Sequence, residues 1–199
     1  MTPAAPPGVI GILLAAGRGV RFGGDKLLAR MGSQVAGECV GSLACRNLLA
    51  ALPRVIAVVR PDDRALAAAL GASGARIVRC PRADEGMGAS LACGVASAPD
   101  AAGWIVALAD MPWVAPQTIA RVAAAITEGA PIAAPFHQGE RGHPVGFGRA
   151  CYEALVALGS DEGAKSIVAA HRDSLARIDV DDPGILRDVD TPADLQSAR

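Results

Sequence analysis

The chain has 199 residues, enough for one domain of ordinary size that buries most of its apolar surface. Hydrophobic residues make up 51% of it and charged residues 20%, with a formal net charge of −1. This balance excludes the basic surface that binds a nucleic-acid backbone or an anionic membrane, so we expect neither as a partner.

The N-terminus reads as a short tail in front of the domain. Residues 1–7 contain three prolines and lack the cationic and apolar regions of a signal peptide. No apolar run approaches the roughly 18 residues of a membrane span. The five cysteines are an odd number without a CxxC pair, which is typical of buried thiols in a reducing compartment. We therefore expect a flexible tail at 1–7, a single domain at 8–199 and a cytoplasmic location.

Short apolar runs alternate along the chain with longer alanine-rich stretches. Buried strands are predicted where the runs are aliphatic or β-branched and bounded by Gly, Pro or Asp: 9–15, 55–59, 76–80, 104–109 and 131–135. Helical spacing predicts helices at 34–52, 62–70, 88–98 and 116–128, and Asp62 is a candidate cap of the second. Such continuously apolar strands, separated by helices, predict an α/β domain with a doubly wound, mostly parallel sheet covered on both faces.

The loop after the first predicted strand is rich in glycine and in positive charge. In AAGRGVRFGGDK, residues 15–26, glycines let backbone N–H groups approach an anion, while Arg18, Arg21 and Lys26 add positive charge. The segment fits neither of two common phosphate motifs: Lys26 follows Asp25 where the Walker A motif has glycine, and the GxGxxG motif lacks its last glycine. Doubly wound sheets bind ligands at the carboxyl ends of their strands, so the loop predicts a polyphosphate site there.

Aspartates follow apolar residues at two further places. Asp110 comes directly after the predicted strand 104–109, where a carboxylate faces the ligand crevice. Near the C-terminus, ILRDVDTPADL contains Asp188 and Asp190. Carboxylate oxygens are the ligands that Mg²⁺ on a triphosphate requires. Together with the glycine loop, these residues predict Mg²⁺-dependent chemistry on a nucleoside triphosphate.

Several segments together carry a family resemblance. LAAGRGVRFGGDKLL resembles the signature LAAGxxxRxGxxK of the MobA-like nucleotidyltransferases, and GMGASLACGV, LADMP, RGHPVGF, SDEGAKSIV and DVDTPADL match further family segments in order. The resemblance runs from about residue 8 to residue 195 and is greatest to molybdenum cofactor cytidylyltransferases. It implies the single-domain, Rossmann-like fold of nucleotide-diphospho-sugar transferases, which is also called GT-A-like.

The resemblance also implies roles for individual residues. Arg21 and Lys26 would act in catalysis by neutralising charge on the phosphates. The nucleotide would contact Ala15, Ala16, Gly17, Arg18, Gly19, Lys26, Gly88, Ser90 and Asp110. Mg²⁺ would bind Asp110 and Asp188, with Asp188 preferred over Asp190 because it matches the first aspartate of the family's DxxTP element. Arg141 and His143, in GERGHPVGF, would line the acceptor pocket, where His143 is equally well read as a packed loop residue. Ser90 is alternatively read as a helix cap.

Enzymes of this family attack the α-phosphorus of a nucleoside triphosphate with a substrate phosphate and release pyrophosphate. For this chain the resemblance implies CTP, because LAAG and the short spacing to Lys26 replace the LAGG pattern of the guanylyl branch. The implied acceptor is molybdopterin or the molybdenum cofactor, and a molybdoenzyme or its maturation factor is a further candidate partner. The alternatives are a sibling that uses GTP or another phosphorylated acceptor, and a non-catalytic carrier of the cofactor.

One segment departs from the family pattern. MGSQVAGECV, at 31–40, stands where the family often has GKPLL. It has no proline and two extra glycines, so we expect the helix that follows to start late or to pack loosely.

Overall fold

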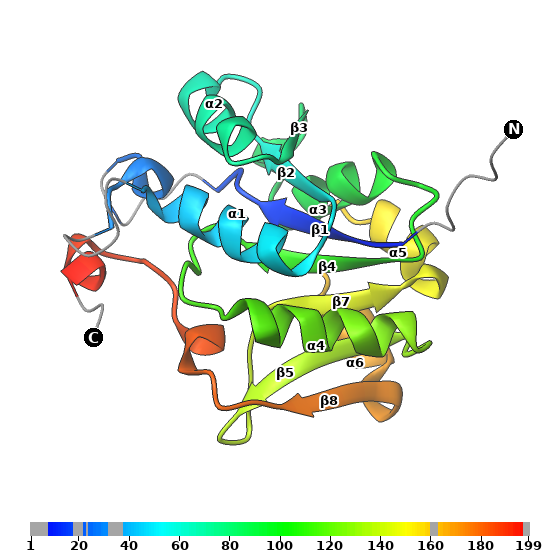
Figure 1. Cartoon of the computed structure of the whole chain (residues 1–199). Coiled ribbons are helices and arrows are strands. Elements are labelled where there is room, and N and C mark those ends of the chain that lie inside the picture. Colours follow the sequence, from blue (N-terminus) through cyan, green and yellow to red (C-terminus); the bar gives the residue numbers. More distant parts are fainter. Residues whose placement is uncertain (1–7, 18–21, 23, 32–37, 160–162, 197–199) are drawn as a thin grey trace, which may run out of the picture.

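A central sheet organises the chain (Figure 1), which a computed structural model describes at residues 8–17, 22, 24–31, 38–159 and 163–196. The strands found within these residues are β1 (Val9–Leu14), β2 (Val55–Val59), β3 (Arg76–Arg79), β4 (Gly103–Leu108), β5 (Ile132–His137), β6 (Glu140–Arg141), β7 (Val145–Gly148) and β8 (Leu175–Asp179). They are joined in the order β3-β2-β1-β4-β7-β5-β6, and β8 pairs with β5.

Most of the pairings are parallel. β1 pairs in parallel with both β2 and β4, so that Leu14 lies opposite Val58 on one side and Leu108 on the other. β3 and β8 are also parallel to their neighbours, whereas β7 runs antiparallel to β4 and β5. The carboxyl ends of β1, β2 and β4 therefore meet at one edge of the sheet, and the prediction of a mostly parallel sheet is confirmed.

Helices cover both faces of this sheet (Figure 1). They are α1 (Val40–Ala51), α2 (Arg64–Ala72), α3 (Met87–Ala96), α4 (Pro116–Thr127), α5 (Tyr152–Val156) and α6 (Lys165–Ala170). Buried side chains of α1, α2 and α4 belong to one hydrophobic core, and those of α3, α5 and α6 belong to a second core on the other face. The fold class predicted from the sequence, a Rossmann-like domain wound on both faces of its sheet, is confirmed.

Alternation along β1 explains why two cores form. Leu13 points into the core under α1, α2 and α4, whereas Ile10 and Ile12 point into the core under α3. α3 lies close to the sheet because of Gly94, where a Cβ atom would come within 2.8 Å of side-chain carbons of Ile12 and Val58. The N-terminus of α3 is thereby held near the carboxyl ends of β1 and β2.

The predicted elements differ from the observed ones at several boundaries. α1 begins at Val40, because Cys39 is extended and forms a β-bridge with Arg30, so the start at residue 34 predicted from apolar spacing is wrong. The late start expected from the unusual segment 31–40 is confirmed. The cap of α2 is Asp63, which accepts a hydrogen bond from the Leu66 amide, and not Asp62. β6, β7 and β8 were not predicted. The tail at 1–7 lies outside the described residues.

The five cysteines are free thiols. Cys45, Cys80 and Cys151 are buried, whereas Cys39 and Cys93 are half-buried, so burial was predicted correctly for three of them. Burial raises the pKa of Cys45 to about 11, which keeps that thiol protonated at neutral pH. None of the helices in the described part of the chain has the length and apolar character of a membrane span.

Candidate functional site

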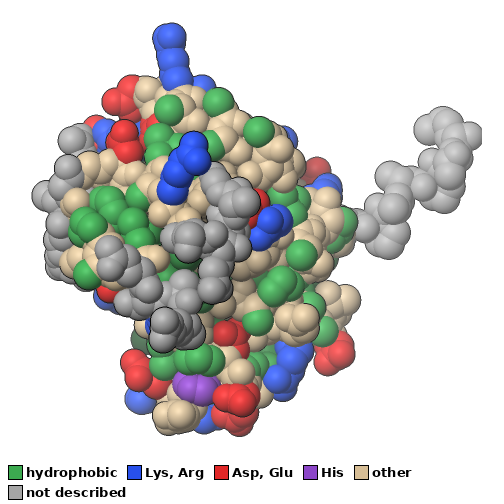
Figure 2. All heavy atoms as spheres, turned by 60° about the vertical axis from the view of Figure 1, so that its left-hand side comes forward, with side chains coloured by type: hydrophobic (Ala, Val, Ile, Leu, Met, Phe, Trp, Pro, Cys, Tyr) green, Lys and Arg blue, Asp and Glu red, His purple; other side chains and the backbone are tan. Residues whose placement is uncertain are grey.

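A cavity of about 550 Å³ opens at the carboxyl ends of the parallel strands. Its walls come from the end of β1 and the loop that follows, the 3-10 helix Lys26–Leu28, the end of β2, the N-terminus of α3 and the end of β4. Figure 2 turns this end of the molecule toward the viewer, and basic and acidic side chains lie close together on it. The site is thus where the sequence predicts it, at the carboxyl edge of the sheet.

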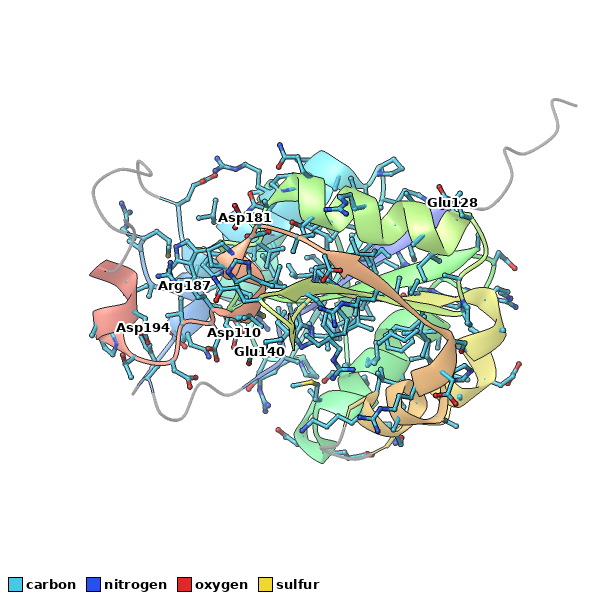
Figure 3. The ribbon with its side chains drawn as sticks, turned by 90° about the horizontal axis from the view of Figure 1, so that it is seen from below. Asp110, Glu128, Glu140, Asp181, Arg187 and Asp194 are labelled. Carbon is cyan, nitrogen blue, oxygen red and sulfur yellow. The ribbon has the colours of Figure 1, made fainter. Side chains whose placement is uncertain are left out.

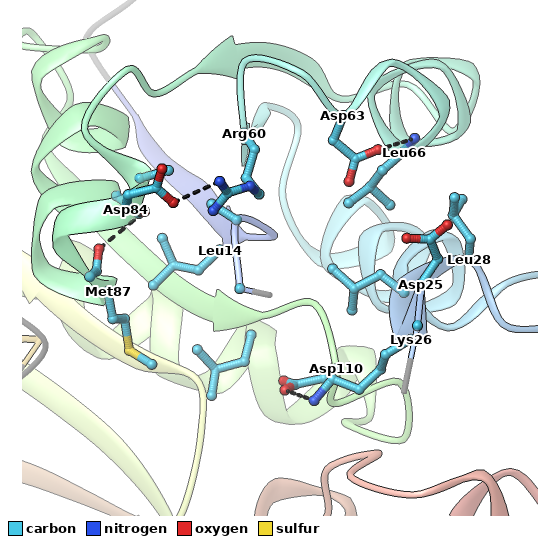
Figure 4. A pocket seen from close by; sticks show the side chains of 18 residues that line it. Leu14, Asp25, Lys26, Leu28, Arg60, Asp63, Leu66, Asp84, Met87 and Asp110 are labelled. Atoms are coloured by element: carbon cyan, nitrogen blue, oxygen red, sulfur yellow. Dashed lines mark hydrogen bonds and ion pairs between the residues drawn. The ribbon is translucent and has the colours of Figure 1, made fainter. Parts of the chain in front are cut away.

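Lys26 forms an ion pair with Asp110, one of the two predicted metal ligands, at the wall of the cavity (Figure 4). Its Nζ lies 2.8 Å from Asp110 Oδ2, at the end of β4, and 3.6 Å from Asp190 Oδ1. Only 12% of the Lys26 side chain is exposed, against 25% for Asp110 and 43% for Asp190. The ammonium group therefore stands between two carboxylates that come from segments 80 residues apart in the sequence.

The C-terminal aspartates are joined to Asp110 through the backbone. The amide of Val189 donates a hydrogen bond of 2.8 Å to the Asp110 carbonyl, which brings Asp188 and Asp190 to the end of β4. Partial burial and the charges of Asp190 and Asp110 raise the pKa of Asp188, although the charge of Lys26 opposes this. These carboxylates repel one another, and a cation placed among them would relieve that repulsion.

The resemblance favoured Asp188 over Asp190 as a metal ligand, and it is Asp190 whose carboxylate lies 3.6 Å from Lys26 Nζ. Both aspartates belong to the same short segment, whose end is fixed where Asp194 accepts hydrogen bonds from the amides of Asp190 and Thr191. Within the described residues, no group of three His, Cys, Asp or Glu side chains forms a ready-made metal site. Mg²⁺ in proteins commonly takes part of its ligands from substrate phosphates and water.

A second ion pair stands on the opposite wall of the cavity (Figure 4). Arg60 follows β2, and its Nη2 lies 2.6 Å from Oδ1 of Asp84, which precedes α3. Ser90, one turn into α3, is buried, and its hydroxyl donates a hydrogen bond of 3.3 Å to the carbonyl of Gly86, which directly precedes the helix. Ser90 therefore does not cap the helix, because the N-cap position belongs to Gly86.

The two residues predicted to contact an acceptor have different surroundings. Arg141 lies exposed in β6, whereas His143 is largely buried beside Pro144 behind the end of β4. Burial lowers the pKa of His143, and the charge of Arg141 lowers it further, against the opposing effect of Asp110. Its Nδ1 atom is buried without a hydrogen-bond partner. His143 thus packs behind the end of β4, and its assignment to the acceptor pocket stays a prediction.

The structure brings together some of the predicted residues and leaves others aside. Ala16, Gly17, Lys26, Ser90 and Asp110 line the cavity. Ala15 and Gly88 are buried next to lining residues and do not line it themselves. Arg18, Gly19 and Arg21 lie outside the described residues.

Several charged or exposed residues of the cavity wall were missed, among them Arg60, Asp63, Asp84 and Met87. Arg60 could have been found, because it directly follows a predicted strand and so lies at the ligand edge. Asp63, Asp84 and Met87 sit in turns and at helix starts, where sequence spacing gives no such signal. Met87 is 47% exposed, and among the described residues it is the large hydrophobic side chain that faces solvent. A Cβ atom on Gly163 would lie 3.4 Å from its sulfur, so Met87 stands between the cavity and the start of α6.

Residues 11–175 match the MobA-like NTP transferase domain family. The chain belongs to this family. It is therefore a nucleotidyltransferase of MobA-like type, and the resemblance seen in its sequence is confirmed.

Several individual proteins are similar to this chain over most of its length. The purine catabolism protein PucB of Bacillus subtilis is 28% identical over 97% of this chain and 97% of the relative. The 2-C-methyl-D-erythritol 4-phosphate cytidylyltransferase of Cereibacter sphaeroides is 36% identical over 68% of this chain and 64% of the relative. The crystal structure of Rv0371c from Mycobacterium tuberculosis is similar over 96% of this chain and 97% of that one, with a TM-score of 0.81 and 28% identity. A further structure of Rv0371c is a complex with manganese, with 26% identity and a TM-score of 0.76 over 96% of this chain and all of that one.

Proposed function

We propose that this MobA-like protein transfers CMP from CTP to the phosphate of molybdopterin or of the molybdenum cofactor and releases pyrophosphate. The observation that carries the proposal is the contact between Lys26 and Asp110 at the carboxyl edge of the sheet, with Asp190 beside it. It combines a cation for phosphate with a carboxylate for a metal ion in the cavity wall, and it places a second carboxylate next to them.

The triphosphate would lie along the loop that follows β1. Gly17 lines the cavity, and a Cβ atom there would meet no atom within 4 Å, so a ligand can approach the backbone closely. Lys26 would neutralise charge on the α-phosphate and on the departing pyrophosphate. Arg21 would share this role, and Arg18 and Gly19 would contact the phosphates; these three assignments rest on the sequence motif alone.

Asp110 and Asp188 would hold Mg²⁺, with Asp190 as the alternative second ligand. The donor set fits, because hard oxygen ligands from two segments converge where their charges raise the pKa of Asp188. The manganese complex of Rv0371c supports a divalent metal ion in this family. Such an ion supplies Lewis-acid charge to the phosphate oxygens when it is bound.

The cytosine ring would lie between Ala15–Gly17 and the N-terminus of α3. Gly86 and Ser90 line the cavity there, and Gly88 adds no side chain to the first turn of α3. The first amides of a helix have no partner within it, so they can bind base or phosphate oxygens. Ser90 would turn its hydroxyl from the Gly86 carbonyl toward the base. The cytidylyl chemistry of the Cereibacter relative supports this choice of nucleotide.

The acceptor would enter on the side of β6 and α6. Arg141 is an exposed cation on this side and suits an acceptor phosphate, whereas buried, neutral His143 would support the loop from beneath. Met87 offers a thioether to a flat ring, a contact that such sulfur atoms make well. A pterin has such a ring, whereas a sugar or alditol phosphate does not.

In the proposed reaction an acceptor phosphate oxygen attacks the α-phosphorus of CTP. A bond forms between this oxygen and phosphorus, the bond from phosphorus to the α–β bridging oxygen breaks, and pyrophosphate leaves with both electrons of that bond. The protein contributes positioning and charge neutralisation, since no residue needs to bond covalently to the substrate.

Two alternatives belong to the same test. A GTP-using sibling, or one with a different phosphorylated acceptor, would keep the loop, Lys26 and the aspartates. A non-catalytic carrier of the cofactor would have no use for a cation and carboxylates arranged around a phosphate site. Incubating the protein with each nucleoside triphosphate, Mg²⁺ and molybdopterin, and measuring pyrophosphate, separates them. We expect release with CTP and molybdopterin together; release with no combination of triphosphate and acceptor would leave only the carrier.

A further inference from the structure

Asp182 is a buried carboxylate that plays no part in the proposed chemistry. It is 9% exposed and lies between β8 and the C-terminal aspartates. Its Oδ2 accepts hydrogen bonds from the Thr118 hydroxyl at 2.7 Å and the Ala115 amide at 2.9 Å, and its Oδ1 accepts one from the Gly184 amide at 3.0 Å. All three donors are uncharged, so the carboxylate is satisfied entirely by a precise arrangement of backbone and hydroxyl groups.

These donors belong to the two segments that carry the site aspartates. Ala115 and Thr118 begin α4, directly after the loop that leaves β4 at Asp110. Gly184 belongs to the 3-10 helix Pro183–Leu186, which leads into Asp188 and Asp190. Asp182 thus joins the two segments at their base, across 64 and 67 residues of sequence.

Further contacts join the same two segments nearer to the cavity. The guanidinium of Arg187 stacks over the ring of Trp113 at 4.3 Å, and Gly184 lies so close to the Trp113 carbonyl that a Cβ atom has no room there. At the far end, the Val189 amide binds the Asp110 carbonyl. Figure 3 shows Arg187 and Asp110 at the same end of the molecule, with Glu128, after the other end of α4, far from them.

We propose that Asp182 is a positioning residue that sets the separation between Asp110 and the Asp188–Asp190 segment, and so the affinity of the site for a divalent metal ion. The inference rests on the proposed function. A metal ion held by carboxylates from two segments needs both at one fixed spacing, because its bond lengths vary little. Loss of the Asp182 hydrogen bonds leaves every metal ligand present, but it lets the distance between Asp110 and the Asp188–Asp190 segment fluctuate.

The test uses three variants and one control. Asp182→Ala removes all three hydrogen bonds. Asp182→Asn keeps one acceptor oxygen and turns an NH₂ group toward one of the donors, and Thr118→Val removes the hydroxyl alone. Ile126→Ala loosens the same helix α4 at its other end, where Ile126 is buried in the core. It therefore reports what a general loss of stability does.

The primary readout is the dissociation constant of Mn²⁺ from the full-length protein with an unreactive CTP analogue, measured by electron paramagnetic resonance. We expect about a tenfold weaker Mn²⁺ complex for Asp182→Ala, of the order seen when a group orienting a metal ligand is removed. Asp182→Asn and Thr118→Val should lie between Asp182→Ala and wild type. Affinity for the analogue without metal should stay within about twofold, and saturating metal should restore most of kcat.

A wild-type Mn²⁺ affinity in folded Asp182→Ala would overturn the inference and leave the proposed function standing. If Asp182→Ala does not fold, wild-type affinity in Thr118→Val and Asp182→Asn does the same. An equal loss of affinity in Ile126→Ala at a matched melting temperature would also overturn it, since general loosening would then suffice. Failure of wild-type protein to bind Mn²⁺ with the analogue would overturn both the inference and the metal site of the proposed function.

Discussion

Val189 donates its backbone amide to the carbonyl oxygen of Asp110 at 2.8 Å. This single bond places a C-terminal segment against the end of β4, so that Asp188 and Asp190 stand on either side of the residue that is tied to Asp110. The carboxylates of the site therefore converge through backbone pairing, although they lie about 80 residues apart in the sequence. The predictions below test what this convergence is for.

Lys26→Ala should lower kcat/KM by about 100-fold, the loss usual when one preorganised charge partner of the transition state is removed. The fold should survive, because Lys26 and Asp110 line an open cavity and not a hydrophobic core. Steady-state pyrophosphate release measures the effect. Arg46→Ala is the matched control, since Arg46 lies on α1, pairs with Glu38 and does not line the cavity. Near-normal turnover in folded Lys26→Ala would remove the lysine from the mechanism.

Replacing the site aspartates one at a time should separate their roles. Asp110→Asn and Asp188→Asn keep the size of the side chain and lose its charge, so activity should fall severely and the half-saturating Mg²⁺ concentration should rise. Asp190→Asn should have a milder effect, and Asp179→Asn on β8 should have none. Rates measured across a Mg²⁺ titration give both quantities. Collapse at Asp190 together with indifference at Asp188 would reverse the choice of the second ligand.

Asp188→Asn should stabilise the metal-free protein at neutral pH. The pKa of Asp188 is raised in the folded state, so its contribution to stability is present at low pH and is lost as the pH rises through the folded pKa. An asparagine avoids that loss, and its advantage should disappear near pH 3, below the ordinary aspartate pKa of about 3.9. Thermal melts at pH 7 and pH 3, with a chelator present, measure the difference in stability between the variant and wild type. A variant no more stable than wild type at pH 7, or equally stabilised at pH 3, would contradict the prediction.

Ser90→Ala should raise the KM for CTP by about fivefold with little change in kcat, because a neutral hydrogen bond to the base contributes about 1 kcal/mol to binding. Ser73→Ala is the control: Ser73 donates the same kind of bond to the carbonyl four residues back, at the end of α2 and outside the cavity. Similar small effects of both variants would mean that Ser90 serves only the helix.

The sequence predicted the central part of this fold well because local and tertiary preferences agree there. β2 was predicted at its observed ends, and α3 and α4 within one or two residues, since their apolar spacing matches the two cores. β7 has the sequence VGFG, whose glycines disfavour a strand, and its pairing with β4 stabilises it nonetheless. α1 was predicted too long because apolar spacing alone did not mark the extended Cys39.

The residues of the candidate site also fall into those that local sequence predicts and those that depend on tertiary contacts. Lys26 and Asp110 were found from sequence because one follows a glycine-rich loop and the other ends a strand. The distance between them, the approach of Asp190 and the burial of His143 depend on tertiary pairing that no local pattern encodes. The sequence could mark Asp182 only as a cap of the turn at Pro183, because its bond from the Gly184 amide is local, whereas its bonds from Ala115 and Thr118 cross more than 60 residues.

The choice of nucleotide tests the account most directly. Equal CTP and GTP compete for limiting molybdopterin in the presence of Mg²⁺, and mass analysis identifies the dinucleotide formed. We expect the cytosine dinucleotide to predominate, because a wider purine clashes in a pocket fitted to cytosine and leaves its polar groups unpaired. Ala16→Gly, toward the guanylyl pattern, should weaken this preference without abolishing turnover. A predominance of the guanine dinucleotide would contradict the cytidylyl assignment, and the absence of any dinucleotide would contradict the transfer to molybdopterin itself.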